Sequence, residues 1–268
     1  MTTKAVCALS LLGMLAGAAG AAGGAEPATA PSAAALAKSV RQVRFSDGFE
    51  VRLSLTVIDA DGHRAAPIKL AVVGQFGVDK ARLVVRGISP DAVRDRFVAA
   101  ERDPSGRLRV LQYARPLADG VAEADPLARL FGSDLVVWDM LSPWWDWPQQ
   151  SAVGTGAVAG RDCRVVRSQA NAPAAHVHEV VSCVDAALGI ALKTELLDAR
   201  RSPVRTTVVE QVMRNVSGVA FVKRMTITSG DRSATEVEVY AGDENYLIGA
   251  DTFAALDGRP PAGTKADK

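Results

Sequence analysis

The chain has 268 residues, 48% of them hydrophobic, and its 31 basic and 30 acidic residues leave a formal net charge of +1. This length supports one sizeable core or two small ones. So small a charge imbalance argues against nucleic acid as the main partner, because phosphate binding needs a concentrated basic face.

The first 25 residues have the pattern of a secretory signal peptide. Lys4 supplies the positive charge, Ala5–Ala22 is an apolar stretch of small residues, and Ala22–Ala25 offers small-residue cleavage sites. Cys7 lies at the start of the apolar stretch, whereas a lipidated cysteine would follow it. A retained membrane anchor is the alternative, but glycine and alanine make the segment only weakly hydrophobic. No later run approaches the roughly 18 apolar residues of a membrane helix, so we expect a cleaved, exported and soluble protein.

Export would leave two cysteines, Cys163 and Cys183, in an oxidising compartment. They flank a turn signal at Asn171–Pro173, and a hairpin centred on Pro173 would place them opposite each other. Facing residues of an antiparallel pair are close to disulfide distance, which predicts a Cys163–Cys183 bond. Two buried free thiols are the alternative.

Residues 26–48 are predicted to form a linker and an N-terminal helix. Glu26–Pro31 is rich in Pro and Ala. Ser32 is a suitable N-cap for a helix over Ser32–Val43, whose apolar residues recur at helical spacing. The turn residues Ser46–Gly48 end it.

The clearest strand is Phe49–Val57, in which apolar and polar residues alternate. Period 2 means that one face is apolar and the other is solvated. Asp61–Gly62 indicates a hairpin turn. Ser89–Arg94 is ambiguous between a short helix and a loop, and Arg115–Ala128 is interpreted as loop because Pro and Gly interrupt it. The other strands of this half are expected around Ile68–Val72, Leu83–Val85, Phe97–Glu101 and Leu108–Tyr113, the last two joined by a turn at Asp103–Gly106.

The second half of the chain is also predicted to consist of strands, at the spacing typical of an antiparallel meander. Gly258–Lys268 is a polar tail that we expect to be disordered. The predicted strands are Ala152–Val158, Arg161–Ser168, His176–Asp185, Ile190–Asp198, Val204–Val212, Gly218–Ser229 and Ala234–Tyr240.

About eleven strands and few helices predict a mainly β fold for residues 49–257. An antiparallel sheet of that length should curl toward a barrel. A barrel of this strand number is too wide for its own side chains to fill easily and tends to enclose a cavity.

One apolar, aromatic stretch, Leu130–Pro148, interrupts the strands and contains all four tryptophans of the protein. We call it the insert. Ser133 is expected to cap a helix through Leu141, with Asp134 in its first turn. An ordinary core-packing helix and a helix over the cavity are both consistent with its apolar face. The insert also holds Trp144, Trp145 and Trp147 around two prolines, a pattern that suits an exposed lip touching lipid or a partner protein.

The sequence contains few patterns typical of catalytic, cofactor or metal sites. Gly154–Gly160 is similar to a phosphate loop but opens no helix, so we interpret it as a turn region. His176 and His178 share one face of a predicted strand, which two exposed hairpin histidines explain as well as a metal site does.

The acidic residues of the insert, Asp134, Asp139 and Asp146, could act as paired carboxylates. A helix cap and two solvated positions explain them equally well. We therefore expect no catalytic residues, no cofactor and no metal, and a protein that is not an enzyme.

Several short motifs point to one known family. They are Ser89–Arg94, Phe131–Asp134, Asp139–Leu141, Gly160–Cys163, Met225–Ile227, Thr235–Val239 and Asp251–Phe253. With these motifs, spread over residues 49–256, the chain resembles the LolA-type outer-membrane lipoprotein-sorting family. It departs from that family where the Leu108–Leu130 region is short and loop-like, and Trp144–Trp147 matches no family motif.

The resemblance implies an incomplete antiparallel β-barrel with a small helical lid, a hydrophobic cavity that holds acyl chains, and a periplasmic location. The expected function is a carrier of acylated lipoproteins or lipids toward the outer membrane, with an inner-membrane transporter and an outer-membrane acceptor as partners. The alternative is a non-catalytic sensor of the same fold. The candidate lipid-binding residues are Val51, Leu53, Leu55, Leu70, Val72, Leu83, Val85, Trp138, Met140, Leu141, Trp144 and Trp145.

Overall fold

The computed structural model describes residues 31–42, 48–77, 80–117, 119–174, 176–230 and 233–261. The predicted signal peptide and the last seven residues lie outside the described residues. The helices are α1 (Ala33–Gln42) and α2 (Val137–Leu141), with short 3-10 helices η1 (Asp91–Val93), η2 (Leu130–Gly132) and η3 (Pro143–Asp146). The strands are β1 (Phe49–Ile58), β2 (Ile68–Phe76), β3 (Ala81–Ser89), β4 (Arg96–Arg102), β5 (Leu108–Ala114), β6 (Ala122–Glu123), β7 (Gln149–Val158), β8 (Arg161–Ala174), β9 (Val177–Asp185), β10 (Ile190–Leu197), β11 (Pro203–Arg214), β12 (Ala220–Ser229) and β13 (Ala234–Asp243).

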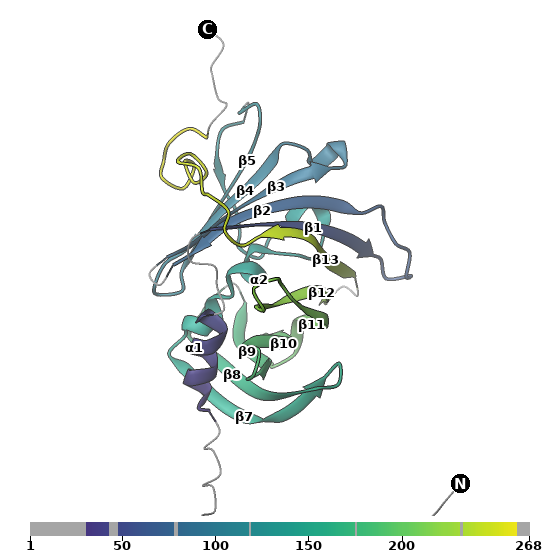
Figure 1. Cartoon of the computed structure of the whole chain (residues 1–268), viewed down its shortest axis with the longest axis vertical. Coiled ribbons are helices and arrows are strands. Elements are labelled where there is room, and N and C mark those ends of the chain that lie inside the picture. Colours follow the sequence, from purple (N-terminus) through teal and green to yellow (C-terminus); the bar gives the residue numbers. More distant parts are fainter. Residues whose placement is uncertain are drawn as a thin grey trace, which may run out of the picture. The chain divides into compact units, whose positions relative to one another are not determined.

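The described strands form one antiparallel sheet in the order β6-β5-β4-β3-β2-β1-β13-β12-β11-β10-β9-β8-β7 (Figure 1). Within the described residues β6 and β7 do not pair with each other, so the sheet is an incomplete barrel. The mainly β prediction is confirmed, with thirteen described strands in place of about eleven. One addition, β6, comes from the Arg115–Ala128 segment that we interpreted as loop, because two of its residues pair with β5.

The early strands follow their sequence pattern closely. Leu53 and Leu55 of β1 are buried and pair with Val239 and Val237 of β13. On its other side β1 pairs with β2, so the first and last strands of the domain lie side by side at the middle of the sheet. The strand with the clearest alternation in the sequence therefore lies near the middle of the sheet.

Helix α1 begins as predicted. The Ser32 hydroxyl oxygen accepts a hydrogen bond from the Ala35 backbone nitrogen at 3.2 Å, which satisfies one of the free N–H groups of the first turn. Ala33, Leu36 and Ala37 form its buried face. Val43, the predicted last residue, lies outside the described residues.

The structure decides the conformation of two segments, Ser89–Arg94, which was ambiguous in the sequence, and Gly154–Gly160, which was interpreted as a turn region. Ser89 ends β3 and the 3-10 helix η1 follows it, so Ser89–Arg94 is neither a regular helix nor a plain loop. The interpretation of Gly154–Gly160 as a turn region is wrong for most of its length. Residues up to Val158 belong to β7 and pair with β8, leaving the turn at Ala159–Gly160.

The Cys163–Cys183 disulfide is present, with the two Cα atoms 5.3 Å apart. Its predicted register is wrong, because Cys183 lies opposite Val165 and the two cysteines are diagonal neighbours. A register shift between Gln169 and Ala174 moves the pairing away from a hairpin centred on Pro173. Gly156 of the neighbouring strand packs against the disulfide, and a Cβ added there would lie in ordinary van der Waals contact with Cys183 Sγ, at 3.4 Å.

The last described residues pack on the face of β3–β5 that points away from the insert. Phe253 and Leu256 are buried against Phe97 and Tyr113, whose rings stack with centroids 5.0 Å apart. None of the described helices is long and apolar enough to cross a membrane.

Candidate functional site

The insert lies in the connection between the two edges of the open sheet, because it stands between β6 and β7 in the chain and leads directly into β7. The predicted helix from Ser133 through Leu141 is wrong in its start, since α2 begins only at Val137. Asp139 Oδ2 accepts a hydrogen bond from the Val136 backbone nitrogen at 3.2 Å, which serves as the start signal of this short helix. Ser133 instead donates its hydroxyl proton to the Leu130 carbonyl at 2.7 Å, before the helix.

Alternate residues of the insert face two different apolar clusters. The first apolar cluster is built on β1–β5, with Ile227 of β12 and Val237 of β13. It receives Leu135, Val137 and Leu141 from the insert.

The second apolar cluster joins the buried face of α1 to β8, β9 and β10. It receives Val136, Trp138, Trp144 and Trp145 from the insert. We call the strands of the first cluster and those of the second cluster the two arms of the curved sheet. The insert therefore lies between the two arms and contacts both, and Figure 1 shows α2 in this position. Because Trp138 and Leu141 pack in different clusters, their helical spacing does not describe one apolar face.

The residues proposed from the sequence to bind lipid gather in these two clusters. Trp144 and Trp145 expose only 4% and 2% of their surface, so the expected exposed lip is wrong for them. Trp147 is partly buried against the second cluster. The strand residues Val51, Leu53, Leu55, Leu70, Val72, Leu83 and Val85, with Met140 and Leu141, lie in or against the first cluster, and Trp138, Trp144 and Trp145 lie in the second.

Two buried indole groups of the insert lack a hydrogen-bond acceptor. The Nε1 atoms of Trp138 and Trp144 have no partner among the residues that the structure describes. Leaving a buried donor unsatisfied costs about 1–3 kcal/mol. The second cluster thus holds two polar donors in an otherwise apolar environment.

Asp134 anchors the beginning of the insert to the end of β12 and the start of β13. Its Oδ1 accepts hydrogen bonds from the hydroxyls of Ser229 and Ser233, each at 2.8 Å, and its Oδ2 accepts one from Thr235 at 2.9 Å. Arg129 forms an ion pair with the same carboxylate at 3.0 Å. The carboxylate is a structural anchor with its acceptor capacity occupied.

Two buried ion pairs hold the rest of the insert. Arg205 of β11 binds Asp139 of α2, and Arg102 of β4 binds Asp146 of η3 with Nη1 and Oδ2 2.6 Å apart. Arg102 also donates to the Leu141 carbonyl at 3.1 Å. The interpretation of Asp139 and Asp146 as solvated positions is therefore wrong.

Sequence reasoning missed the two arginines. Arg102 continues the alternation of Val98 and Ala100, which places a charge on the apolar face of β4. A charged residue in phase with an apolar face is the signal that could have identified it, because such a group needs a buried partner.

A pocket of about 280 Å³ lies between the ends of β4 and β5 and the segment 119–131. Its apolar wall includes Val98, Val110, Leu130 and Val137, all members of the first cluster. Its polar rim includes Arg96, Gln112, Asp119, Asp125 and Arg129. This volume is just below the usual range for ligand pockets, about 300–1,000 Å³. The pocket gives access from the surface to the first cluster.

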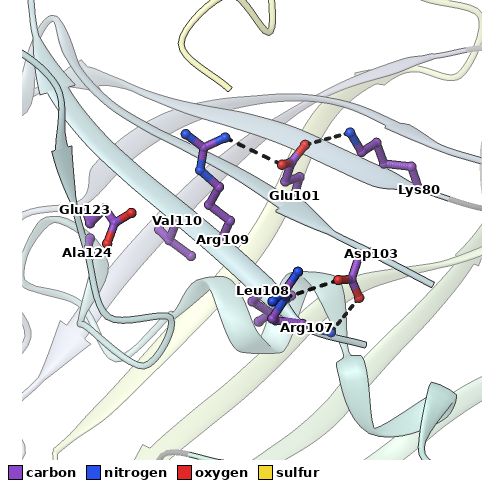
Figure 2. Close-up of a pocket in the computed structure, with 9 residues that line it drawn as sticks. All are labelled: Lys80, Glu101, Asp103, Arg107, Leu108, Arg109, Val110, Glu123 and Ala124. Atoms are coloured by element: carbon purple, nitrogen blue, oxygen red, sulfur yellow. Dashed lines mark hydrogen bonds and ion pairs between the residues drawn. The ribbon is translucent and has the colours of Figure 1, made fainter. Parts of the chain in front are cut away.

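A second pocket, of about 420 Å³, shares Val110 and Ala124 with the first and is lined mainly by charged residues (Figure 2). Glu101 pairs there with Lys80 at 3.1 Å and lies 3.7 Å from Arg109. Asp103 pairs with Arg107 at 3.3 Å. Burial raises the pKa of Asp103, but hydrogen bonds from Ser105 and Arg107 outweigh it and hold the pKa below its usual value. Five of the six charged residues that line this pocket therefore lie in ion pairs with one another, and the sixth is Glu123.

The ligand types of a metal site come together at one exposed turn, Asp59–His63. Asp59, Asp61 and His63 place ligand atoms within 4.8 Å of one another. The Asp59 carboxylate already accepts the backbone N–H groups of the other two, which is ordinary turn geometry. His176 and His178 are both exposed, and the described residues bring no third ligand to them.

A family model described only as an uncharacterized protein matches residues 119–249. No curated protein matches the sequence.

Solved structures share the fold. A domain described as an outer membrane lipoprotein-sorting protein domain, from Vibrio parahaemolyticus, is 12% identical with a TM-score of 0.73, covering 84% of this chain and 97% of that one. A DUF1329 family protein from Desulfovibrio piger is 15% identical with the same TM-score and the same coverage. A LolA superfamily protein from Nitrosomonas europaea is 13% identical with a TM-score of 0.63, covering 82% and 95%. The resemblance predicted from short motifs is thus confirmed in the fold.

Proposed function

We propose that this protein is an exported, non-enzymatic carrier that holds acyl chains of lipoproteins or lipids on the inner face of the sheet. The observation that supports it is the insert itself, which covers the apolar inner surfaces of both arms of the sheet. The chain buries these surfaces with a separate, mostly non-strand segment rather than with another sheet. Such an arrangement keeps an apolar binding surface out of water while no cargo is bound.

The apolar contacts of the insert and those of a bound cargo are of similar energy, which suits an exchange of one for the other. Burying a large apolar side chain contributes about 1.5–3 kcal/mol, so the eight large apolar side chains that the insert buries contribute about 12–24 kcal/mol. A pair of long acyl chains is worth on the order of 20 kcal/mol at about 0.8 kcal/mol per CH₂. Cargo can therefore replace the contacts of the insert, and the insert can cover the surface again after release.

The polar contacts of the insert suit reversible attachment. Asp134, Asp139 and Asp146 each bind groups that belong to strands, and water can solvate the same groups when the insert moves. The desolvation of a buried ion pair largely offsets its attraction, so separating both partners into water costs far less than removing one of them. The ion pairs fix the position of the insert without making its displacement prohibitive.

The pocket beneath segment 119–131 is the proposed entry for the first acyl chain. It already contacts Val98, Val110 and Leu130 of the first cluster. The orphan N–H groups of Trp138 and Trp144 are suitable donors for the ester or amide oxygens of an acyl linkage. In this proposal the periplasm is the site of action, and an inner-membrane transporter and an outer-membrane acceptor are the partners.

The test is lipid analysis of protein purified from the periplasm, by native mass spectrometry and solvent extraction. We expect acyl lipid or a lipoprotein fragment in near-stoichiometric amount, and uptake of a fluorescent fatty acid by delipidated protein. Lipid-free protein that also takes up no fatty acid would overturn the proposal. A stable protein complex without lipid transfer would favour the sensor of the same fold.

A further inference from the structure

The edge strand β7 is unusual for its exposure and its lack of charge. It ends the sheet, and no described strand pairs with its outer side (Figure 1). Residues 151–155 are exposed in succession, so both faces of the strand are open. Its sequence, QQSAVGTGAV, has no charged residue and no proline.

Sheet edges are normally protected by lysines, prolines, bulges or short strands, because their free N–H and C=O groups accept another strand. The opposite edge follows this rule, since β6 has only two residues. In β7 the protection is limited to one irregularity between Ala152 and Gly154. On its inner side β7 pairs with β8 from Gln149 to Val158, and the disulfide ties β8 to β9. The edge is therefore a long and well-supported template for an extended peptide.

The start of this edge is attached to the tryptophan segment of the insert. Gln150 donates its amide protons to the Trp144 carbonyl at 2.8 Å and the Trp147 carbonyl at 3.0 Å. Its side-chain oxygen accepts from the Ser168 hydroxyl at 2.7 Å. A ligand held in the second cluster, against the tryptophans, would therefore lie next to the first residues of β7.

We propose that β7 binds the polypeptide of an acylated cargo by strand addition, while the acyl chains occupy the apolar site. This inference rests on the proposed function. The partner is the extended, uncharged linker that follows an acylated N-terminal cysteine. With the cysteine at the tryptophan end, the linker runs parallel to β7 from residue 151 to residue 158. That span takes about eight residues, roughly 26 Å at 3.3 Å per residue.

The side chains of the β7 edge favour recognition of the backbone of the bound linker over recognition of its side chains. Ala152, Gly154, Gly156 and Ala157 offer no large side chain and no charge to recognise one. Recognition then comes from main-chain hydrogen bonds, the mode used in strand addition. A carrier with this edge accepts linkers of many sequences but distinguishes an acylated polypeptide from a free lipid.

The experiment compares four synthetic probes on delipidated protein. They are a diacylglyceryl cysteine amide, the same group with a ten-residue Ser/Gly/Thr extension, the extended probe N-methylated at alternate residues, and the unacylated extension. Tryptophan fluorescence gives affinities, and hydrogen exchange reports on residues 151–158. We expect the extension to increase affinity at least tenfold, N-methylation to abolish that gain, and exchange in β7 to slow at least tenfold.

Matched variants test whether the gain in affinity from the extension depends on β7. Val153→Lys with Thr155→Lys should remove the gain from the extension, whereas Gln211→Lys with Met213→Lys in the interior strand β11 should retain it. Val153 and Met213 are both 42% exposed, so the two pairs alter similar surfaces. Both variants should bind the bare diacylglyceryl cysteine equally.

The outcomes separate the two proposals. Equal affinity for the bare and extended probes, with unchanged exchange in β7, overturns strand addition and leaves the carrier function standing. Failure of the bare probe to bind contradicts the carrier function, and strand addition is then overturned if the unacylated extension also gives no protection. Slower hydrogen exchange in β7 that depends on protein concentration and not on any probe would assign the edge to a second copy of this chain. That result would overturn the inference.

Discussion

Arg205 of β11 forms a bidentate ion pair with Asp139 of α2. Its Nε donates to Oδ1 at 2.9 Å and its Nη2 donates to Oδ2 at 2.5 Å. The side chains are only 8% and 9% exposed. Arg205 also donates to the Asp134 backbone carbonyl. One strand arginine thus fixes both the anchor region and the helix of the insert.

Removing one partner of this pair should destabilise the fold. Asp139→Ala leaves the Arg205 charge buried without its carboxylate, and such losses cost about 3–5 kcal/mol. Urea unfolding followed by circular dichroism measures it. Asp91→Ala is the control, because Asp91 is 89% exposed in its pair with Arg94 and exposed pairs contribute little. Equal losses in the two variants would contradict a specific role for the buried pair.

Filling the apolar pocket should block lipid uptake without unfolding the protein. Ala128 is exposed on the pocket wall, so Ala128→Trp places a large side chain in a volume of about 280 Å³. We expect fatty-acid uptake to slow at least tenfold, with the unfolding midpoint nearly unchanged. Ala186→Trp, at the exposed turn after β9, is the control and should leave uptake unaltered. Normal uptake by the Ala128→Trp variant would exclude this pocket as the entry.

The disulfide should contribute through the unfolded chain. Cys163 and Cys183 are separated by 20 residues, and closing such a loop is worth about 3 kcal/mol in the chain-entropy model. Replacing both cysteines by alanine should lower the free energy of unfolding by a similar amount. The double variant should also lose all sensitivity to reductant, which is measured by repeating the titration with dithiothreitol. A wild-type protein insensitive to reductant would refute the prediction.

The pKa of Glu236 should respond to Arg64. Hydrogen bonds from Arg64, at 2.7 and 2.5 Å, lower this pKa below its ordinary value despite the opposing effect of burial. A lowered folded-state pKa means that the stabilisation is present above the unfolded pKa, about 4.3, and is lost as the pH falls through the folded value. Arg64→Ala should raise the pKa of Glu236 toward the ordinary value in a carboxyl NMR titration. Arg94→Ala should leave it unchanged, and an unaltered pKa in Arg64→Ala would remove Arg64 as its cause.

Much of the sheet was predictable because strand formation with one buried face is a local property. The alternation of Phe49–Val57 identified β1, and the candidate lining residues from Val51 to Val85 all lie in or against one cluster. Turn residues located the hairpins. The pairing of β8 with β9 was less predictable, since an irregularity near Gln169 shifts the register without an evident sequence signal.

The insert shows where local reasoning fails. Its residues have apolar character and approximate helical spacing, which predicted one amphipathic helix with an exposed lip. The insert lies between two apolar surfaces, so successive residues such as Val136 and Val137 are buried in opposite directions. A pattern that assumes a single buried face cannot describe a segment with two.

The sequence by itself determined the mainly β fold, the cysteine pair, the start of α1 and the segment that interrupts the strands, because these depend on side-chain periodicity and short-range turn chemistry. Only the tertiary structure decided that Trp144 and Trp145 are buried, that Asp139 and Asp146 are ion-paired, and that β7 is left as an open edge. The physical reason is that Arg102 and Arg205 reach the insert from β4 and β11, far away in the chain, and that which strand ends a sheet depends on the closure of the whole sheet.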